Sequence, residues 1–460
     1  MNDERPRDDR EAAVASQQPV ASRTVGADEL ASRALAVLEA NQLGPVTLPS
    51  PQLYPHQWSW DAAFIAMAYA HVDQPRAEGE LRALFAGQWS NGMLPHIVFA
   101  PGGGPYFPGP DVWQADRSPH APPGQATSGI VQPPVHASAV LQICRHAGDP
   151  EAAARFRTEM LPKLDAWHGY LHRERTRGNG LVEIWHPWES GMDNSPMWDD
   201  ALARIVLTPG DVPSYERVDV LVGPVEERPT GDEYDRYVYL VALFRDLGYD
   251  PAAIREACPF VVQDVLFNAV LVQADRDLAT LAQLAGADPV PYDRRADRTA
   301  AALDGLLWDD DRAHHLGYDV RRQATVTTAT AACFAPLFAG VPSAARAARM
   351  VEAVTASSVR PGSRGFVVPS LSPDDPRFLR TRYWRGPVWP VINWLLYRGL
   401  SRYGYRSEAG QVRAALIDLA REGGFYEHYD PTTGRGHGGG QFAWTAALVL
   451  DLLLDEDGHT

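Results

Sequence analysis

Apolar residues recur at helical spacing along most of the chain. Over residues 28–43, Leu30, Ala34, Val37 and Leu38 follow the i, i+4, i+7, i+8 pattern of one buried helix face, and a Gly-Pro pair ends the pattern. Two-residue alternation of the strand type is scarce, with short extended pieces expected at 93–99, 181–185 and 364–368. Further helices are predicted at 60–72, 75–88, 135–147, 150–173, 233–248, 251–285 (as two helices), 291–307, 327–338, 342–357, 387–403, 407–422 and 441–455.

These helices follow one another with short Pro/Gly-rich breaks and show no sequence repeat, which argues against an α-solenoid. About a dozen helices in succession predict an all-α fold, an (α/α)6 barrel or toroid in which six inner helices are surrounded by six outer ones. Loops of the length seen at 90–132, 174–232 and 358–386 are usually functional, so we expect loop insertions to cap one end of the barrel.

The domain organisation expected from this pattern is simple. Residues 1–25 are charged and aperiodic, which predicts a disordered N-terminal tail. Residues 26–460 contain no linker between two halves, so we expect a single domain there, with insertions at about 90–132 and 174–232.

Composition and charge exclude several classes of protein. The 58 Asp and Glu residues outnumber the 42 Lys and Arg residues, giving a net charge of −16, whereas nucleic-acid binding needs a basic face. No apolar run reaches the ~18 residues of a membrane span. The three cysteines are widely spaced and the N-terminus lacks signal-peptide order, which predicts a cytoplasmic protein without nucleic-acid or membrane partners.

Several of the 13 tryptophans lie in clusters that place aromatic rings beside hydrogen-bonding groups at loop-to-helix boundaries. Any single cluster is explained equally well by core packing, but five together predict that the loops converge on one pocket. The clusters are YPHQWSWDAAF (54–64); His96 with Tyr106 and Gln132; HPWESGMDNSP (186–196); YWRGPVWPVINW (383–394), which contains Trp384 and Arg385; and FYEHYDP (425–431) with Gln441. In the fourth cluster, Arg385 is expected either to clamp a ligand or to pair with a carboxylate.

The missing motifs narrow the chemistry. HExxH and GxSxG are absent and no GxGxxG opens a helix as in a dinucleotide site, so we expect no metal and no cofactor. Aromatic rings and carboxylates suit a sugar site, and glycoside cleavage needs one carboxylic acid and one carboxylate. The residues alone leave four candidates open: Asp61, Glu189, Asp193 and Glu427.

The clustered stretches, together with FYEHYDPTTGRGHGGGQFAWTA, resemble glycoside hydrolase family 63 and, within it, the bacterial mannosylglycerate and glucosylglycerate hydrolases. The likeness is distributed over residues 54–450, and trehalases are similar at a greater distance. The resemblance implies an (α/α)6 catalytic domain and an inverting α-glycosidase. It also implies that Asp193 is the general acid and Glu427 the general base.

The resemblance assigns the binding residues as well. The sugar subsite would be lined by Trp60, Asp61, Trp188, Gly191 and Trp389 and completed by Tyr54, Trp58, His96, Tyr106 and Gln132. The carboxylate of a glycerate aglycone would be held by Arg228, Tyr234, Tyr383 and Gln441. Such donors are required because the substrate is an anion and the protein as a whole is acidic.

We therefore expect hydrolysis of glucosylglycerate, and of mannosylglycerate too, to the hexose and glycerate. Glucosylglycerate is favoured because 41 arginines against a single lysine, Lys163, are typical of G+C-rich genomes in which that solute is expected. The alternatives are an α-glucosidase of a neutral disaccharide or oligosaccharide (trehalase-like or trimming), a sugar epimerase, for which the paired histidines are missing, and a non-catalytic sugar-binding protein. A homo-oligomer, dimer or tetramer, is compatible with the long loops.

Overall fold

The computed structural model describes residues 21–362 and 365–455, and its centre is a closed ring of inner helices. Each inner helix contacts the next, and the last returns to the first. All twelve residues of the first inner helix are buried, as expected of a helix that is apolar on every side. The ring consists of α2 (Ser59–Ala70), α5 (His136–His146), α11 (Val265–Leu284), α13 (Ala335–Phe338), α15 (Pro390–Arg402) and α17 (Ala443–Leu454).

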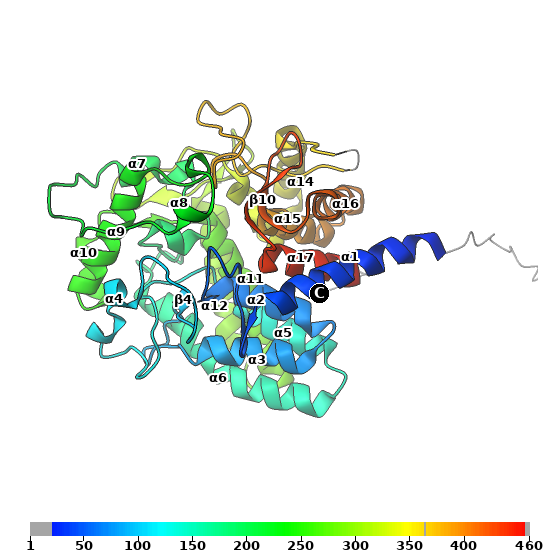
Figure 1. The fold of residues 1–460 in the computed structure, drawn as a ribbon, viewed down its shortest axis with the longest axis horizontal. Coiled ribbons are helices and arrows are strands. Elements are labelled where there is room, and N and C mark those ends of the chain that lie inside the picture. The colour runs from blue at the N-terminus through cyan, green and yellow to red at the C-terminus, as the bar shows by residue number, and fades with distance from the viewer. Residues whose placement is uncertain (1–20, 363–364, 456–460) are drawn as a thin grey trace, which may run out of the picture.

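Outer helices alternate with the inner ones along the chain, which confirms the predicted (α/α)6 barrel. An outer helix buries one stripe only; in α14 this stripe is Ala347, Met350, Val351 and Val354. The first outer helix packs against α17, and Figure 1 shows the two side by side. The outer helices are α1 (Ala21–Ala40), α3 (Gln74–Phe85), α6 (Pro150–Glu174), α12 (Val290–Leu306), α14 (Ala344–Ser357) and α16 (Arg406–Gly423).

The insertions form a cap of short helices, and most of them gather on one side of the barrel in Figure 1. Its longest helix, α9, begins with a capping box in which Thr230 and Glu233 satisfy each other's backbone N–H groups. The cap contains α4 (Pro110–Trp113), η1 (Ala115–Arg117), η2 (Pro187–Ser190), η3 (Pro196–Trp198), α7 (Asp199–Leu202), α8 (Asp219–Val222), η4 (Val225–Glu227), α9 (Gly231–Asp246) and α10 (Pro251–Ala257).

The strands are short, antiparallel and peripheral to the helices. The longest pair joins β10 to β11, and its register shifts between Tyr426 and His428, so Glu427 lies at a bulge. The strands are β1 (Gln42–Leu43), β2 (Val46–Thr47), β3 (Gln57–Trp58), β4 (Ile97–Val98), β5 (Val262–Gln263), β6 (Trp308–Asp309), β7 (His314–His315), β8 (Tyr318–Asp319), β9 (Ala324–Thr325), β10 (Tyr426–Tyr429) and β11 (Gly436–Gly440).

Several predicted boundaries need correction. The expected helix over 327–338 begins only at Ala331, in η5 (Ala331–Phe334), because the preceding Thr-rich residues disfavour a helix and follow directly on strand β9. Only 97–98 of the expected 93–99 strand is a strand, and 181–185 and 365–368 make isolated bridges. Of the expected tail, residues 1–20 lie outside the described part, while 21–25 belong to α1.

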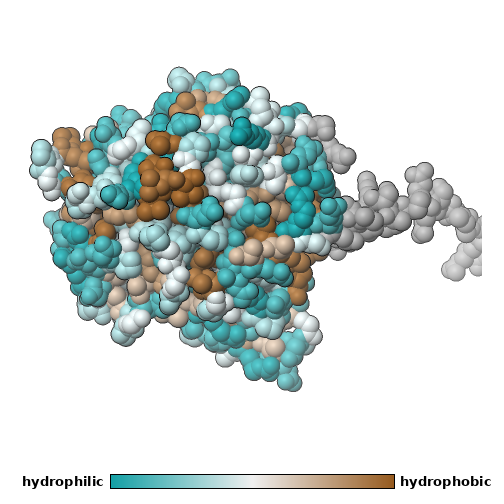
Figure 2. Space-filling model, viewed as in Figure 1, coloured by the Kyte–Doolittle hydropathy of each residue, from teal (hydrophilic) through white to brown (hydrophobic). Residues whose placement is uncertain are grey.

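Two surface properties follow from the described residues. None of their helices combines the length and apolarity needed to cross a bilayer. Apolar side chains are exposed around α8, including Leu221 at 78 % and Val225 at 61 %, and Figure 2 shows an apolar patch at this place.

Candidate active site

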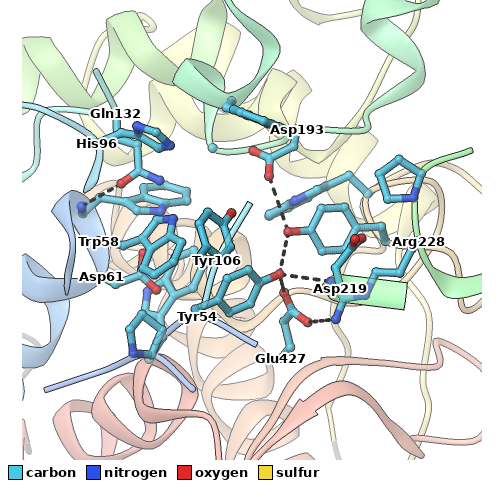
Figure 3. A pocket seen from close by; sticks show the side chains of 18 of the residues that line it. Tyr54, Trp58, Asp61, His96, Tyr106, Gln132, Asp193, Asp219, Arg228 and Glu427 are labelled. Atoms are coloured by element: carbon cyan, nitrogen blue, oxygen red, sulfur yellow. Dashed lines mark hydrogen bonds and ion pairs between the residues drawn. The ribbon is translucent and has the colours of Figure 1, made fainter. Parts of the chain in front are cut away.

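A cavity lies where the N-terminal ends of the inner helices meet the cap (Figure 3). Sixteen of the eighteen predicted site residues line it, although they are spread over nearly four hundred positions of sequence. They are Tyr54, Trp58, Trp60, Asp61, His96, Tyr106, Gln132, Trp188, Gly191, Asp193, Arg228, Tyr234, Tyr383, Trp384, Trp389 and Glu427.

Glu427 is buried at the floor of the cavity and is held by three neighbours. Its Oε1 accepts a hydrogen bond of 2.7 Å from the hydroxyl of Tyr54, and its Oε2 lies 3.2 Å from both Nη2 of Arg228 and the backbone N of Gly439. A Cβ on Gly438, where φ is +70°, would come within 2.2 Å of Oε2. The glycine run therefore leaves room for the carboxyl, and Glu427 lies in a strand rather than in the expected loop.

Asp193 lies across the cavity from Glu427, just after helix η2, and is partly exposed toward the open space (Figure 3). Its Oδ2 is 3.4 Å from the hydroxyl of Tyr383. Burial, reinforced by the nearby charge of Glu427, raises the pKa of Asp193 to about 8. The carboxyl thus keeps its proton near neutral pH, as a general acid must.

The hydroxyls of Tyr54 and Tyr383 lie between the two carboxyls, 3.1 Å from each other. Tyr383 adopts a φ of +32°, which is costly for a residue with a Cβ and occurs mostly at functional positions. The indole of Trp389 donates a 3.0 Å hydrogen bond to its carbonyl oxygen, and the guanidinium of Arg228 lies 5.3 Å from its ring centre. The position of Tyr383 is therefore fixed from both sides.

Asp61 is the third carboxyl of the cavity and lies, as predicted, in the first turn of α2. Burial raises its pKa well above the usual value, and the charges of Glu427 and Asp193 add to this. Among the described residues its carboxyl makes no hydrogen bond to another residue, so it is available to sugar hydroxyls. Beside it, the ring of Trp60 approaches the α-carbon of Gly191 so closely that a Cβ there would lie 2.5 Å from the ring.

His96 contributes a neutral ring. Its Nδ1 is 2.5 Å from the Ser128 hydroxyl, and its ring is stacked toward Trp188 at 6.2 Å. Burial, with a smaller effect of His186, lowers the pKa of His96 well below its usual value. The side chain can therefore donate or accept a hydrogen bond but carries no charge at neutral pH.

Two predicted residues lie outside the cavity lining. Arg385 forms ion pairs with Asp199, at 3.1 Å from Oδ2, and with Glu233 at 2.9 Å, so it is a carboxylate partner within the cap rather than a ligand clamp. Gln441 occupies a turn with a φ of +50° between β11 and α17, and its side chain is exposed. Proximity in sequence to a cluster did not bring these two side chains into the cavity.

Glu189 is eliminated as a reacting group by its neighbours. It is fully buried and accepts two hydrogen bonds from Arg175, at 2.9 and 2.7 Å, and one of 2.6 Å from the backbone N of Trp185. A buried carboxylate saturated by a bidentate arginine serves to hold the cap together.

The sequence reasoning missed several residues of the lining. Among them, Asp219 pairs with Arg217, whose guanidinium lies 4.3 Å from the ring centre of Tyr234. Arg217 precedes α8 and Asp219 begins it, and neither residue belongs to one of the aromatic clusters from which most of the other candidates were predicted. The remaining missed residues are Pro49, Phe107, Val218, Pro229, Phe442 and Trp444.

The site as a whole defines a class of enzyme. Aromatic rings suit the C–H faces of a sugar, and the carboxyls of Asp193 and Glu427 face each other across the space where it would lie. Within residues 21–362 and 365–455, no cluster of three His, Cys, Asp or Glu side chains has the arrangement of a metal site. These features are those of a glycoside hydrolase.

The comparisons with known proteins agree with this class. Residues 54–445 match the model of the mannosylglycerate hydrolase MGH1-like glycoside hydrolase domain, and the chain belongs to this family. It is 49% identical over 431 residues to the mannosylglycerate hydrolase of Rubrobacter radiotolerans, covering 93% of this chain and 97% of the relative. Identity to the glucosylglycerate hydrolase of Mycolicibacterium hassiacum is 39%, covering 92% and 98%.

Comparison with solved structures agrees with this family. The GH63 mannosylglycerate hydrolase of Thermus thermophilus, in complex with Tris and D-glycerate, superimposes with a TM-score of 0.85 at 43% identity, covering 92% of this chain and 99% of that one. The neutral trehalase of Saccharomyces cerevisiae, at 16% identity and a TM-score of 0.56, covers 88% and 72% and shares the fold alone.

Proposed function

We propose that this glycoside hydrolase is an inverting enzyme that releases a hexose and glycerate from glucosylglycerate and mannosylglycerate. The observation that carries the proposal is the pair of unlike carboxyls. Burial raises the pKa of Asp193 to about 8, whereas Glu427 forms a 3.2 Å ion pair with Arg228.

In the proposed single displacement, the protonated Asp193 donates to the glycosidic oxygen. Ionised Glu427 removes a proton from a water molecule that attacks the anomeric carbon from the opposite face. The contacts through Tyr54 and Tyr383 measure 2.7, 3.1 and 3.4 Å and limit the distance between the carboxyls to about 9 Å, which accommodates the separation of about 6.5–9.5 Å expected for inversion.

The anionic aglycone is supported by the electrostatics of the cavity. Arg228 is buried in its wall, and residues at the N-terminal ends of α2, α15 and α17 contribute to the lining. These groups can hold an anion locally, although the chain carries a net charge of −16 and four carboxyls line the same cavity. A neutral disaccharide, the substrate of the alternative α-glucosidase, would leave Arg228 without a ligand anion.

The choice of hexose is proposed to be permissive. The relative named glucosylglycerate hydrolase is 39% identical, and relatives named mannosylglycerate hydrolase reach 49% and 44%. The two sugars differ in the orientation of one hydroxyl. We therefore propose that both glycosides are cleaved, without the preference for glucose that the composition suggested.

The deciding experiment measures kcat/KM on glucosylglycerate, mannosylglycerate, trehalose and kojibiose, with NMR detection of the first anomer released. We expect cleavage of the two glycerate glycosides and release of the β-anomer from an α-glycoside. Preference for a neutral disaccharide would contradict the substrate, and release of the α-anomer would contradict inversion. Asp193→Asn and Glu427→Gln should both be nearly inactive while remaining folded.

We also propose that the chain assembles with itself and acts in the cytoplasm. The exposed Leu221 and Val225 of the apolar patch support self-assembly. The three unpaired cysteines support a reducing compartment such as the cytoplasm. Light scattering should give a mass above the 50.5 kDa of one chain. A monomer at micromolar concentration would contradict the assembly.

A further inference from the structure

A single displacement leaves both carboxyls in the wrong protonation state. Asp193 has lost its proton to the leaving oxygen, and Glu427 has gained one from water. The next turnover requires the reverse, so one proton has to pass from Glu427 to Asp193 after the products leave.

A continuous hydrogen-bonded chain joins these two groups in the ligand-free cavity, and it is the chain of dashed lines in Figure 3. It runs from Oε1 of Glu427 to the hydroxyl of Tyr54 at 2.7 Å, then to the hydroxyl of Tyr383 at 3.1 Å, and then to Oδ2 of Asp193 at 3.4 Å. The empty site is also the state in which the proton must return, because a bound aglycone would occupy the space beside these hydroxyls.

Both hydroxyls are held where they are by the packing of their rings. Tyr54 makes edge-to-face contacts with Trp58 at 5.2 Å and with Phe442 at 6.0 Å. Tyr383 is edge-on to Trp389 at 5.2 Å and carries the strained backbone described above. Rings fixed in this way keep the donor and acceptor oxygens in line without rearrangement.

We propose that Tyr54 and Tyr383 form a proton relay that returns the proton from Glu427 to Asp193 after each turnover. The inference rests on the acid and base roles proposed above. The O–H bond at Glu427 breaks as its proton passes to the Tyr54 oxygen, the hydroxyl proton of Tyr54 passes to Tyr383, and that of Tyr383 forms the new O–H bond at Asp193. Each tyrosine gains one proton and loses one, so both end as neutral phenols.

The surroundings set the direction of transfer. Arg228 pairs with Glu427 and donates a 3.0 Å hydrogen bond to the Tyr54 oxygen, so it favours the state in which Glu427 is ionised and accepts from Tyr54. No cation among the described residues pairs with Asp193. Burial, with nearby charges, raises the pKa values of both tyrosines well above the usual value, so the protons move in concert rather than through a phenolate.

The test compares the first turnover with later ones. In Tyr383→Phe, the enzyme starts with Asp193 protonated, so rapid mixing with glucosylglycerate should give a burst of one glycerate per site. Steady-state turnover should then be at least tenfold slower than the burst, and imidazole added at constant pH should restore it by carrying the proton through solution. Tyr54→Phe, which breaks the other link, should behave in the same way.

Tyr403→Phe is the matched control, since it removes a phenol hydroxyl that donates to the carbonyl of Pro342 at 2.5 Å and lies outside the cavity lining. It should show no burst. The relay is overturned if first and later turnovers slow equally in the Tyr383 and Tyr54 variants, or if neither slows. In that case, inactive Asp193→Asn and Glu427→Gln variants would still support the proposed acid and base roles. Activity in either of those carboxyl variants would overturn the roles and the relay together.

Discussion

The carboxyl of Asp193 owes its reactivity to its surroundings. Because burial and Glu427 raise its pKa to about 8, the protonated fraction that can act as acid is nearly complete at pH 7 and is lost as pH rises through 8. We expect kcat/KM to fall about tenfold per pH unit above that value. A pH–rate profile that starts to fall near pH 5 would contradict the assignment of Asp193 as the acid.

Arg228 donates hydrogen bonds to two residues in the ligand-free site, Glu427 and Tyr54. We propose that the glycerate carboxylate becomes its third acceptor. Arg228→Ala should raise KM by roughly 10–100-fold, the loss expected for hydrogen bonds between charged groups, and lower kcat by a smaller factor because Glu427 loses its cation. Arg228→Lys, which keeps the charge, should have a KM between those of the unmodified enzyme and Arg228→Ala. An unchanged KM in Arg228→Ala would remove it from the carboxylate site.

At the scale of elements, the β10–β11 hairpin matters because Gly438 of its second strand presents no side chain to Glu427, the proposed base. Gly438→Ala would force a Cβ to 2.2 Å from Oε2 of Glu427 at an unfavourable φ, so we expect a roughly 100-fold loss of kcat in a chain that still folds. In Gly440→Ala, on the same strand, the Cβ would meet the ring of Tyr426 at an ordinary 3.4 Å. Steady-state kinetics and circular dichroism of both variants provide the comparison; equal activity would contradict this role of Gly438.

The same hairpin shows the limits of reading elements from sequence. Helical periodicity located most helices within a few residues, because a buried stripe such as that of α14 gives a regular spacing of apolar residues in the sequence. The strand that carries Glu427 gives no such pattern. Its partner strand is GHGGG, which has no alternation of apolar and polar residues, and the pairing depends on contacts of backbone atoms.

The site was predictable where rings and carboxyls cluster, as at Trp60 and Asp193, because such clusters are rarely all core. It was not predictable for Asp219, which reaches the cavity from the start of α8, a segment without a motif. Nor was it predictable for Arg385, whose sequence neighbours line the cavity while its own side chain points to Asp199 and Glu233. The direction in which a side chain points depends on the tertiary structure and is not determined by a cluster in the sequence.

At the scale of the whole molecule, the ring of inner helices is joined by one buried carboxylate. Asp451 of α17 accepts hydrogen bonds from His71 at the end of α2 (2.9 Å), Gln142 of α5 (2.7 Å) and Trp394 of α15 (2.8 Å). Asp451→Ala would leave these three groups without their acceptor, so we expect the free energy of unfolding to fall by ~3–5 kcal/mol, measured by urea denaturation.

The control for this variant is Asp165→Ala, which removes a partly exposed pair with Arg295 at the surface and should cost no more than ~1 kcal/mol. Similar losses in Asp451→Ala and Asp165→Ala would mean that the buried network does not join the helices.

The contact between α1 and α17 has a consequence for how the protein is made. The first and last helices of the barrel are neighbours, so the barrel cannot close until the ribosome has released its final helix. Glu427 and Phe442 belong to the same late segment, whereas Asp61 and Asp193 are synthesised long before. A nascent chain that has not reached β10 therefore carries the proposed acid without the proposed base, and we expect no activity until this late segment has been made.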